Sequence, residues 1–276
     1  MRCIFCKQPS DNTKSIEHIV PESLGNKNHV LPKGYVCDKC NNYFSHKIER
    51  PFLEQKNIRL LRFEESIPNK KSKIPAIEAA WGDELINIRK KEINGEEALI
   101  LELTPEQIIQ LYNNAAPDIL VLPAFDSIVL PPQSSITSRF IGKIAFEFLS
   151  IKIADDKDWL DFLIDSPQFD AIRNHVRLGT TPNWPCSIRR IYDSNTVWDS
   201  YDNESFQIIF ESDFFSTTFS KEQLTHEGDI ETDMYFVISL WGIEYAINLA
   251  GPEIEGYKKW LADHDNVSPL YFKKSI

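Results

Sequence analysis

The chain has 276 residues, of which 42% are hydrophobic and 26% are charged, and its formal net charge is −11. This composition is ordinary for a globular chain and excludes disordered and collagen-like proteins. The length predicts one or two domains, and no apolar run reaches the roughly 18 residues that a membrane-spanning helix needs.

The N-terminus has no apolar signal-peptide core, so nothing marks the chain for export. An odd count of five cysteines argues against a disulfide framework and favours metal ligands or buried thiols. We therefore expect a cytoplasmic protein that makes no membrane contact.

Charge is distributed unevenly along the chain. Residues 1–75 contain 14 Lys and Arg against 8 Asp and Glu, a net of +6, whereas the remaining residues have a net of −17. A basic segment can contact phosphate while an acidic body keeps the protein in solution. The alternative is that solvated faces simply differ in sign, and charge alone does not decide between the two.

The first 75 residues predict a loop, two helices and a linker. Residues 24–34 are rich in Gly, Asn and Lys, which is typical of a loop or ribbon turn. Residues 38–49 have helical periodicity, and Pro51 is expected to close that helix. Residues 52–63 can form a second short amphipathic helix. The polar, basic segment 66–75 is bracketed by prolines and predicts a linker.

Beyond the linker, strand and helix patterns are mixed, which indicates an α+β domain. A hairpin is expected over residues 84–103 around the Asn94-Gly95 turn. Helices are expected over residues 104–116, 135–153, 167–176 and 253–263, and strands over 188–192, 206–219 and 234–249. We predict two domains, a small N-terminal module at residues 1–66 and a larger mixed α+β domain at 76–276, the latter for recognition, sensing or partner binding.

Four of the five cysteines form two pairs with matched spacing. Cys3-x2-Cys6 and Cys37-x2-Cys40 can each bind one metal ion from a tight turn. Two such turns supply a closed tetrahedral thiolate site, for which zinc is the expected metal. A closed site of this kind is structural, because no coordination position stays open for chemistry. The fifth cysteine, Cys186, is expected to be a buried small hydrophobe.

The residues between and after these pairs resemble a known family. Glu17-His18-Ile19-Val20-Pro21 lies between the cysteine pairs, and Asn41-Asn42 follows the last cysteine directly. This combination resembles the HNH endonucleases, and more narrowly their zinc-stabilised branch typified by the phage junction-resolving endonuclease VII. The resemblance covers about residues 3–50. It implies a ββα-metal, treble-clef-like fold that holds one catalytic divalent ion beside the structural zinc.

The resemblance also implies roles for individual residues. His18 matches the general base, and imidazoles ionise near pH 6.5, so a neutral ring is available to deprotonate water. Glu17 stands where most members have aspartate and matches a metal ligand, as does Asn41, with Mg²⁺ or Mn²⁺ as the implied ion. Neighbouring strand residues point to opposite faces, so Glu17 and His18 need either a bend or different roles.

Further candidates are less specific. The residue that orients the base is left open among Asn26, Asn28 and His29, with His29 slightly favoured. Asn42 and His46 stand four residues apart on one helix face, and His46, Lys47 and Arg50 are candidates for contacts to phosphate or metal. A longer basic run is either a solvated helix face or a phosphate track: Lys47, Arg50, Lys56, Arg59, Arg62, Lys70, Lys71 and Lys73.

Taken with the resemblance, these patterns predict a metal-dependent endonuclease that hydrolyses DNA phosphodiester bonds, with a restriction or antiphage-defence role as a candidate. One alternative is a non-catalytic zinc module that binds nucleic acid or protein. Another is a nuclease gated by a small-molecule or protein partner of the C-terminal domain. A homodimer is a further candidate, because a single site of this family cuts one strand.

Overall fold

The computed structural model describes residues 1–113, 115, 117, 119–123, 130–154, 156–180, 183–200, 202, 204–219 and 231–271. The chain packs as two compact units. Unit 1 comprises Met1–Pro21, Asn26–Phe52 and Leu130–Ile276, and unit 2 comprises Glu22–Gly25 and Leu53–Val129. Among the described residues, no helix is both long and apolar enough to cross a membrane.

These units cut the chain differently from the predicted domains 1–66 and 76–276. Unit 1 joins the cysteine-containing segment to the C-terminal region, whereas residues 53–129 pack with one another. The units describe packing, and the predicted domains describe segments that fold independently. The predicted boundary therefore stays a prediction.

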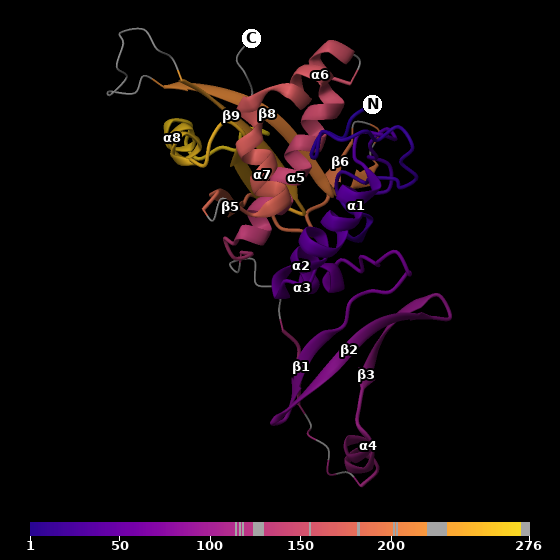
Figure 1. The fold of residues 1–276 in the computed structure, drawn as a ribbon. Helices are drawn as coiled ribbons and strands as arrows, with labels where there is room; N and C mark the ends of the chain where they lie inside the picture. Colours follow the sequence, from indigo (N-terminus) through magenta and orange to yellow (C-terminus); the bar gives the residue numbers. More distant parts are fainter. Residues whose placement is uncertain are drawn as a thin grey trace. The chain divides into compact units, whose positions relative to one another are not determined.

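The N-terminal part of unit 1 contains two antiparallel segments, residues 17–19 and 29–31, which we call the ribbon. A helix follows the ribbon (Figure 1). Leu31 N–H donates to the Glu17 carbonyl at 2.9 Å and Ile19 N–H to the His29 carbonyl at 3.2 Å, so His18 faces Val30 in an antiparallel bridge. The helix then runs through α1 (Asp38–Phe44), a π-helical turn (Ser45–Glu49) and α2 (Arg50–Leu53). Two antiparallel segments and a helix are the predicted ββα arrangement.

The prediction that this helix ends at Pro51 is wrong. It continues to Leu53, and the π-helical turn explains how. In that turn the Arg50 N–H donates to the Ser45 carbonyl, five residues back. A proline in an ordinary helix clashes with the carbonyl four residues earlier, and the widened turn changes the position of the preceding carbonyls.

The larger part of unit 1 is an antiparallel sheet with a helix on each face. Because neighbouring strand residues face opposite sides, Phe236 stacks on Phe148 of one helix at 5.7 Å, while Tyr235 packs with Tyr257 of the other. The strand order is β5 (Cys186–Arg190), β10 (Ile243–Asn248), β9 (Glu231–Leu240) and β8 (Phe210–Phe219), and the helices are α5 (Ser135–Lys152) and α8 (Glu255–Asp263).

The predicted strand over residues 234–249 is two strands, and the prediction missed the turn between them. Trp241 and Gly242 have φ of 51° and 77°, and a Cβ on Gly242 would lie 2.1 Å from the Tyr192 carbonyl oxygen. Only glycine tolerates that approach. The other elements of unit 1 are α6 (Lys157–Asp165), a 3₁₀ turn (Pro167–Phe169), α7 (Asp170–Leu178), β6 (Trp198–Asp199) and β7 (Ser205–Phe206).

Helix α5 is buried between the ribbon–helix module and the sheet. Phe52 of α2 stacks on Phe140 of α5 with ring centroids 3.8 Å apart, and Phe5 packs against Phe146 of the same helix at 5.5 Å. Arg173 of α7 donates to the Ile4 carbonyl at 2.8 Å. The N-terminal module and the C-terminal region therefore share one core.

Unit 2 is a second antiparallel sheet packed on a helix. The predicted hairpin is confirmed, and Asn94 and Gly95 both have positive φ, as a two-residue hairpin turn of this kind requires. Leu60 and Phe63 pack against one face of the sheet. Its elements are α3 (Lys56–Glu64), β1 (Ile77–Trp81), β2 (Glu84–Ile93), β3 (Glu96–Glu102), α4 (Pro105–Tyr112), β4 (Leu120–Val121) and a 3₁₀ turn (Glu22–Leu24), with strand order β3-β2-β1-β4.

The shared core of unit 1 can be tested with Phe140→Ala. Phe140 is fully buried against Phe52, so truncation should lower the free energy of unfolding by about 3–5 kcal/mol. Urea denaturation followed by tryptophan fluorescence measures the change. The control is Phe162→Ala on α6, where the ring is 49% exposed and the loss should stay below about 1 kcal/mol. Equal losses in both variants would contradict the packing described.

Candidate functional site

The four paired cysteines converge on one point. The Sγ atoms of Cys3, Cys6, Cys37 and Cys40 all lie within 4.8 Å of one another, and those of Cys6 and Cys37 are 3.6 Å apart. A tetrahedral site with Zn–S bonds of about 2.3 Å needs sulfurs about 3.8 Å apart. The four thiols therefore fit a zinc ion, as predicted, while Cys186 is buried in the C-terminal sheet.

Local backbone structure positions the two cysteine pairs. The first pair lies on a turn in which Lys7 N–H donates to the Cys3 carbonyl and Lys7 has a φ of 60°. The second pair starts α1, and the Cys37 Sγ accepts from the Cys40 N–H. A hydrogen bond with Cys40 lowers the pKa of the Cys3 thiol, whereas burial raises that of Cys6. A cation at this point would favour the thiolate form of every ligand.

Two side chains of α1 hold the segment that carries Glu17 and His18. The Asp38 carboxylate accepts from the backbone N–H groups of Lys14 and Ser15 at 3.1 and 2.9 Å, and the Ser15 hydrogen bonds lower its pKa. Asn41 donates from Nδ2 to the Ile16 carbonyl at 3.3 Å. The predicted ligand Asn41 is thus bonded to the residue that directly precedes Glu17.

Glu17 points toward α5 and forms an ion pair with Lys143. The Lys143 Nζ also lies 2.8 Å from Glu49 Oε1 and 3.1 Å from Glu147 Oε2, and it donates to the His18 carbonyl at 3.3 Å. Lys143 and Glu147 are fully buried, and Glu17 is 7% exposed. One ammonium therefore joins the ribbon, the helix that follows it and α5.

The charges in this buried cluster are not equal in number, with three carboxyl groups around one ammonium. Burial raises the pKa of Glu147 well above its usual value, more than Lys143 lowers it. Burial disfavours the ammonium of Lys143, but the three carboxyl groups outweigh it and raise its pKa. The shifts therefore favour the neutral form of Glu147 and the ammonium form of Lys143, whose other carboxyl partners are Glu17 and Glu49.

A divalent ion at the predicted catalytic position would have two protein ligands. The Asn41 amide uses its nitrogen for Ile16, which leaves the carbonyl oxygen for a hard cation. Glu17 supplies a carboxylate, one oxygen of which is bonded to Lys143. Mg²⁺ commonly binds through one or two protein oxygens and otherwise keeps water or phosphate oxygens, so the donor set fits such an ion.

The remaining candidates lie on the surface of the module. Asn42, His46, Lys47 and Arg50 are exposed along the helix. His29 is exposed at the ribbon, where its ring packs edge-on against Phe210 with centroids 4.9 Å apart.

Asn26, one of the three residues considered for orienting the base, has a structural role. Its Nδ2 donates to the carbonyls of Val20 and His29 at 2.6 and 2.9 Å, and its Oδ1 accepts from the N–H groups of Asn28 and His29. The side chain is 2% exposed. It therefore fixes the turn of the ribbon.

Sequence reasoning missed Lys143, Glu49 and Glu147. A signal was present for two of them, because Lys143 and Glu147 stand four residues apart within the apolar stripe of α5. Buried charges are rare unless they are paired. Two opposite charges on a buried face indicate a buried network, but its partners Glu17 and Glu49 come from distant parts of the chain.

Comparison with known proteins identifies the same segment. A family model described as HNH endonuclease matches residues 3–57, which include the four cysteines, the ribbon and the helix. The match confirms the resemblance of this segment to HNH endonucleases and supports nuclease activity in general. Searches of curated proteins and of solved structures found no match to the chain.

Loss of one thiolate should release the zinc. Cys40→Ser replaces a buried ligand, so the purified variant should hold well under the one zinc ion per chain expected of wild type. Elemental analysis by mass spectrometry measures the metal content. Cys186→Ser is the matched control, since Cys186 is equally buried but remote from the other thiols. A Cys40→Ser variant that keeps a full zinc ion would refute the assignment.

The Lys143 cluster predicts a large loss of stability when Lys143 is replaced and a small loss when Glu147 is replaced. Lys143→Met leaves buried carboxylates without a cation and should lower the free energy of unfolding by about 3–5 kcal/mol. Glu147→Gln replaces a carboxyl group whose raised pKa favours the neutral form, so it should cost less than about 1 kcal/mol at pH 6.

The pH dependence of the Glu147→Gln variant gives a second measurement. Wild type has a Glu147 pKa raised on folding, so it loses stability as the pH rises above the unfolded value of about 4.3. The free energy of unfolding of the glutamine variant, relative to that of wild type, should therefore increase between about pH 5 and pH 8. Urea denaturation across this range measures the difference. A variant that becomes less stable than wild type as the pH rises would contradict a raised pKa of Glu147.

Proposed function

We propose that this protein is a divalent-metal-dependent endonuclease that hydrolyses DNA phosphodiester bonds. The observation that carries the proposal is the hydrogen bond from Asn41 to Ile16, which lies beside Glu17-His18 within the segment matched by the HNH endonuclease model. The residue types that this chemistry needs, an imidazole base and oxygen ligands for a hard cation, come from the ribbon and the helix that this bond joins.

In the proposed reaction, His18 accepts a proton from a water molecule as its oxygen attacks the scissile phosphorus. The bond from phosphorus to the leaving sugar oxygen breaks, and that oxygen takes up a proton from solvent. Mg²⁺ or Mn²⁺, held by Asn41 and Glu17, would neutralise charge on the phosphate and on the leaving oxygen. Lys143 supports the site by fixing the Glu17 carboxylate and the His18 carbonyl.

The exposed helix face would bind the substrate next to the reacting phosphate. Lys47 and Arg50 supply cations there, and Asn42 and His46 supply shorter polar groups on the same helix. His29 is the proposed partner of the base. These contacts fix the position of the DNA backbone without reading its sequence.

A gated nuclease is the second candidate, and one observation favours it. Glu17 and the His18 carbonyl are bonded to Lys143 of α5, which is packed on the C-terminal sheet. A small molecule or protein that shifts α5 would therefore shift the proposed site. For the endonuclease proposed above, we also propose a restriction or antiphage-defence role, a homodimer and a cytoplasmic location.

The proposal is tested by nicking of supercoiled plasmid with Mg²⁺ and then with Mn²⁺. Zinc-loaded wild type should relax the plasmid when the divalent ion is added, and it should not do so without that ion. His18→Ala should lower the rate by about 10²–10⁴-fold, because it removes the general base.

The matched control for this test is His264→Ala. His264 follows α8, and its ring stacks on Trp260 at 4.1 Å, so the variant should nick at the wild-type rate. Zinc-loaded wild type that never cuts would favour the gated nuclease or the non-catalytic zinc module. Equal cutting by wild type and His18→Ala would refute the assigned base.

A further inference from the structure

Unit 2 contains a basic groove between the loop that follows α3 and strand β2. Its volume is about 660 Å³. Its charged lining is formed by five cations and one carboxylate: Lys71, Lys73, Arg89, Lys90, Lys91 and Glu92. Lys71 and Lys73 come from the segment predicted as a linker, so this segment forms a wall of the groove.

Two of the five cations hold the groove together. Lys90 Nζ donates to the Glu64 carbonyl and to Ser66 Oγ, both at 3.0 Å, and pairs with Glu97 Oε1 at 2.8 Å. This pairing lowers the pKa of Glu97. Arg89 forms an ion pair with Glu102 of the neighbouring strand. Lys90 thus fixes the loop to β2, and neither charge is left for an external ligand.

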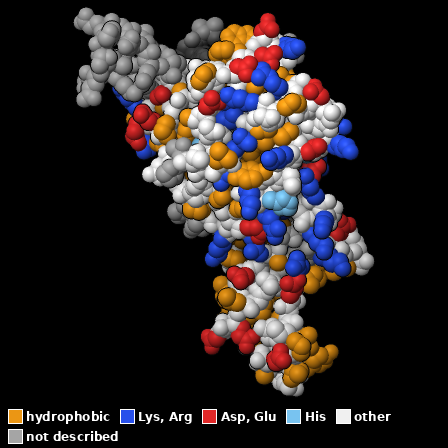
Figure 2. Space-filling view, in the orientation of Figure 1, with side chains coloured by type: hydrophobic (Ala, Val, Ile, Leu, Met, Phe, Trp, Pro, Cys, Tyr) orange, Lys and Arg blue, Asp and Glu red, His pale blue; other side chains and the backbone are white. Residues whose placement is uncertain are grey.

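The other three cations face solvent. Lys71, Lys73 and Lys91 are exposed, and no ion pair involves their ammonium groups among the described residues. Against them the groove carries one carboxylate of its own, Glu92. Figure 2 shows Lys and Arg side chains gathered over this loop and the β2–β3 hairpin, on the right of the view.

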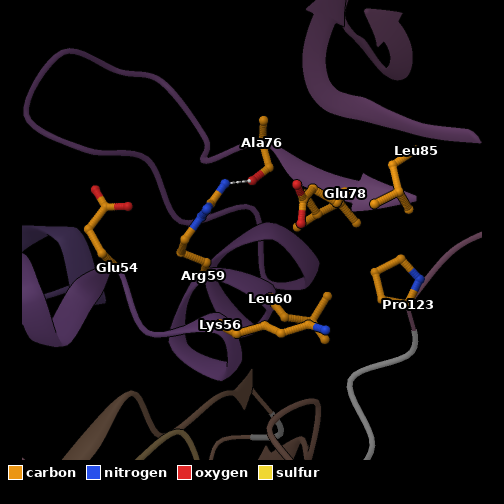
Figure 3. Close-up of a pocket in the computed structure, with 9 residues that line it drawn as sticks. Glu54, Lys56, Arg59, Leu60, Ala76, Glu78, Leu85 and Pro123 are labelled. Atoms are coloured by element: carbon orange, nitrogen blue, oxygen red, sulfur yellow. Dashed lines mark hydrogen bonds between the residues drawn. The ribbon is translucent and has the colours of Figure 1, made fainter. Parts of the chain in front are cut away.

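The basic residues noted between Lys47 and Lys73 do not form one continuous surface in the structure. Arg62 is 6% exposed, and burial lowers its pKa. Arg59 donates to the Ala76 carbonyl at 2.6 Å (Figure 3). The pocket of about 300 Å³ around Arg59 also has Lys56 opposed by Glu54 and Glu78, so its charges cancel. The groove keeps the excess positive charge that this pocket lacks.

We propose that this groove binds the sugar–phosphate backbone of double-stranded DNA through Lys71, Lys73 and Lys91. A row of exposed cations that are free of carboxylate partners attracts a polyanion by releasing its counterions. The rest of the chain is strongly acidic, which makes a locally positive groove the more selective for such a ligand. The inference takes its ligand from the proposed nuclease function, but it concerns a separate surface that binds without cutting.

The test measures binding in the absence of cleavage. The full-length, zinc-loaded chain carrying His18→Ala is titrated onto a fluorescent 30-base-pair duplex without added Mg²⁺ or Mn²⁺, and anisotropy is recorded at several salt concentrations. Adding Lys71→Gln, Lys73→Gln and Lys91→Gln should weaken binding at least about tenfold and reduce the slope of log affinity against log salt by about 3. The matched control adds Lys157→Gln, Lys258→Gln and Lys259→Gln, three exposed lysines of unit 1, and should bind as the parent does.

Further arms separate the outcomes. Unchanged affinity and slope in the groove variant, or equal losses in the control variant, would overturn the proposal. A groove variant that loses binding to phosphatidylserine vesicles but keeps its affinity for the duplex would overturn it as well. Nicking by wild type is measured separately, so a chain that binds through the groove but never nicks would support this inference and refute only the nuclease.

Discussion

The candidate site depends on the contacts of one buried ammonium group, that of Lys143. It binds Glu17 and the His18 carbonyl from the ribbon and Glu49 from the helix, and it stands on α5 beside Glu147. Desolvating a cation costs several kcal/mol, which only good geometry and opposite charges offset. Each carboxylate that replaces this lost hydration is therefore held in place, and with it the backbone on either side of His18.

Two kinds of interaction support the N-terminal module: the cysteine cluster near its start and the packing of Phe52 near its end. The four cysteines would join the first turn to the start of α1 through a shared zinc ion. At the other end, Phe52 is packed on Phe140 and Tyr245. Because Phe52 shares its core with α5 and the C-terminal sheet, a change in those elements would be expected to affect the N-terminal module, as the proposed gated nuclease requires.

The sequence predicted features that depend on neighbouring residues. The cysteine pairs, the Asn94-Gly95 hairpin, and helices α5 and α4 with its Thr104–Gln107 capping box all follow from local chemistry. Features that depend on distant residues were not predictable. The Lys143 cluster unites residues from 17 to 147, and the continuation of the helix past Pro51 depends on a π-helical turn that no simple period predicts. The division of unit 1 between the two ends of the chain has the same cause.

The two units alternate along the chain. Unit 1 is interrupted after Phe52 and resumes at Leu130, so residues 53–129, which make up most of unit 2, are an insertion into it. An insertion is tolerated where the chain can leave and re-enter without disturbing the core, and the ends of this one adjoin the helix that carries Asn41 and the segment that leads into α5. DNA bound to the proposed groove would be held by the same chain as the proposed catalytic residues, because α3 and the loop after it follow the helix that carries Asn41 along the sequence. Such a tether raises the effective concentration of substrate at the site without any sequence-specific contact.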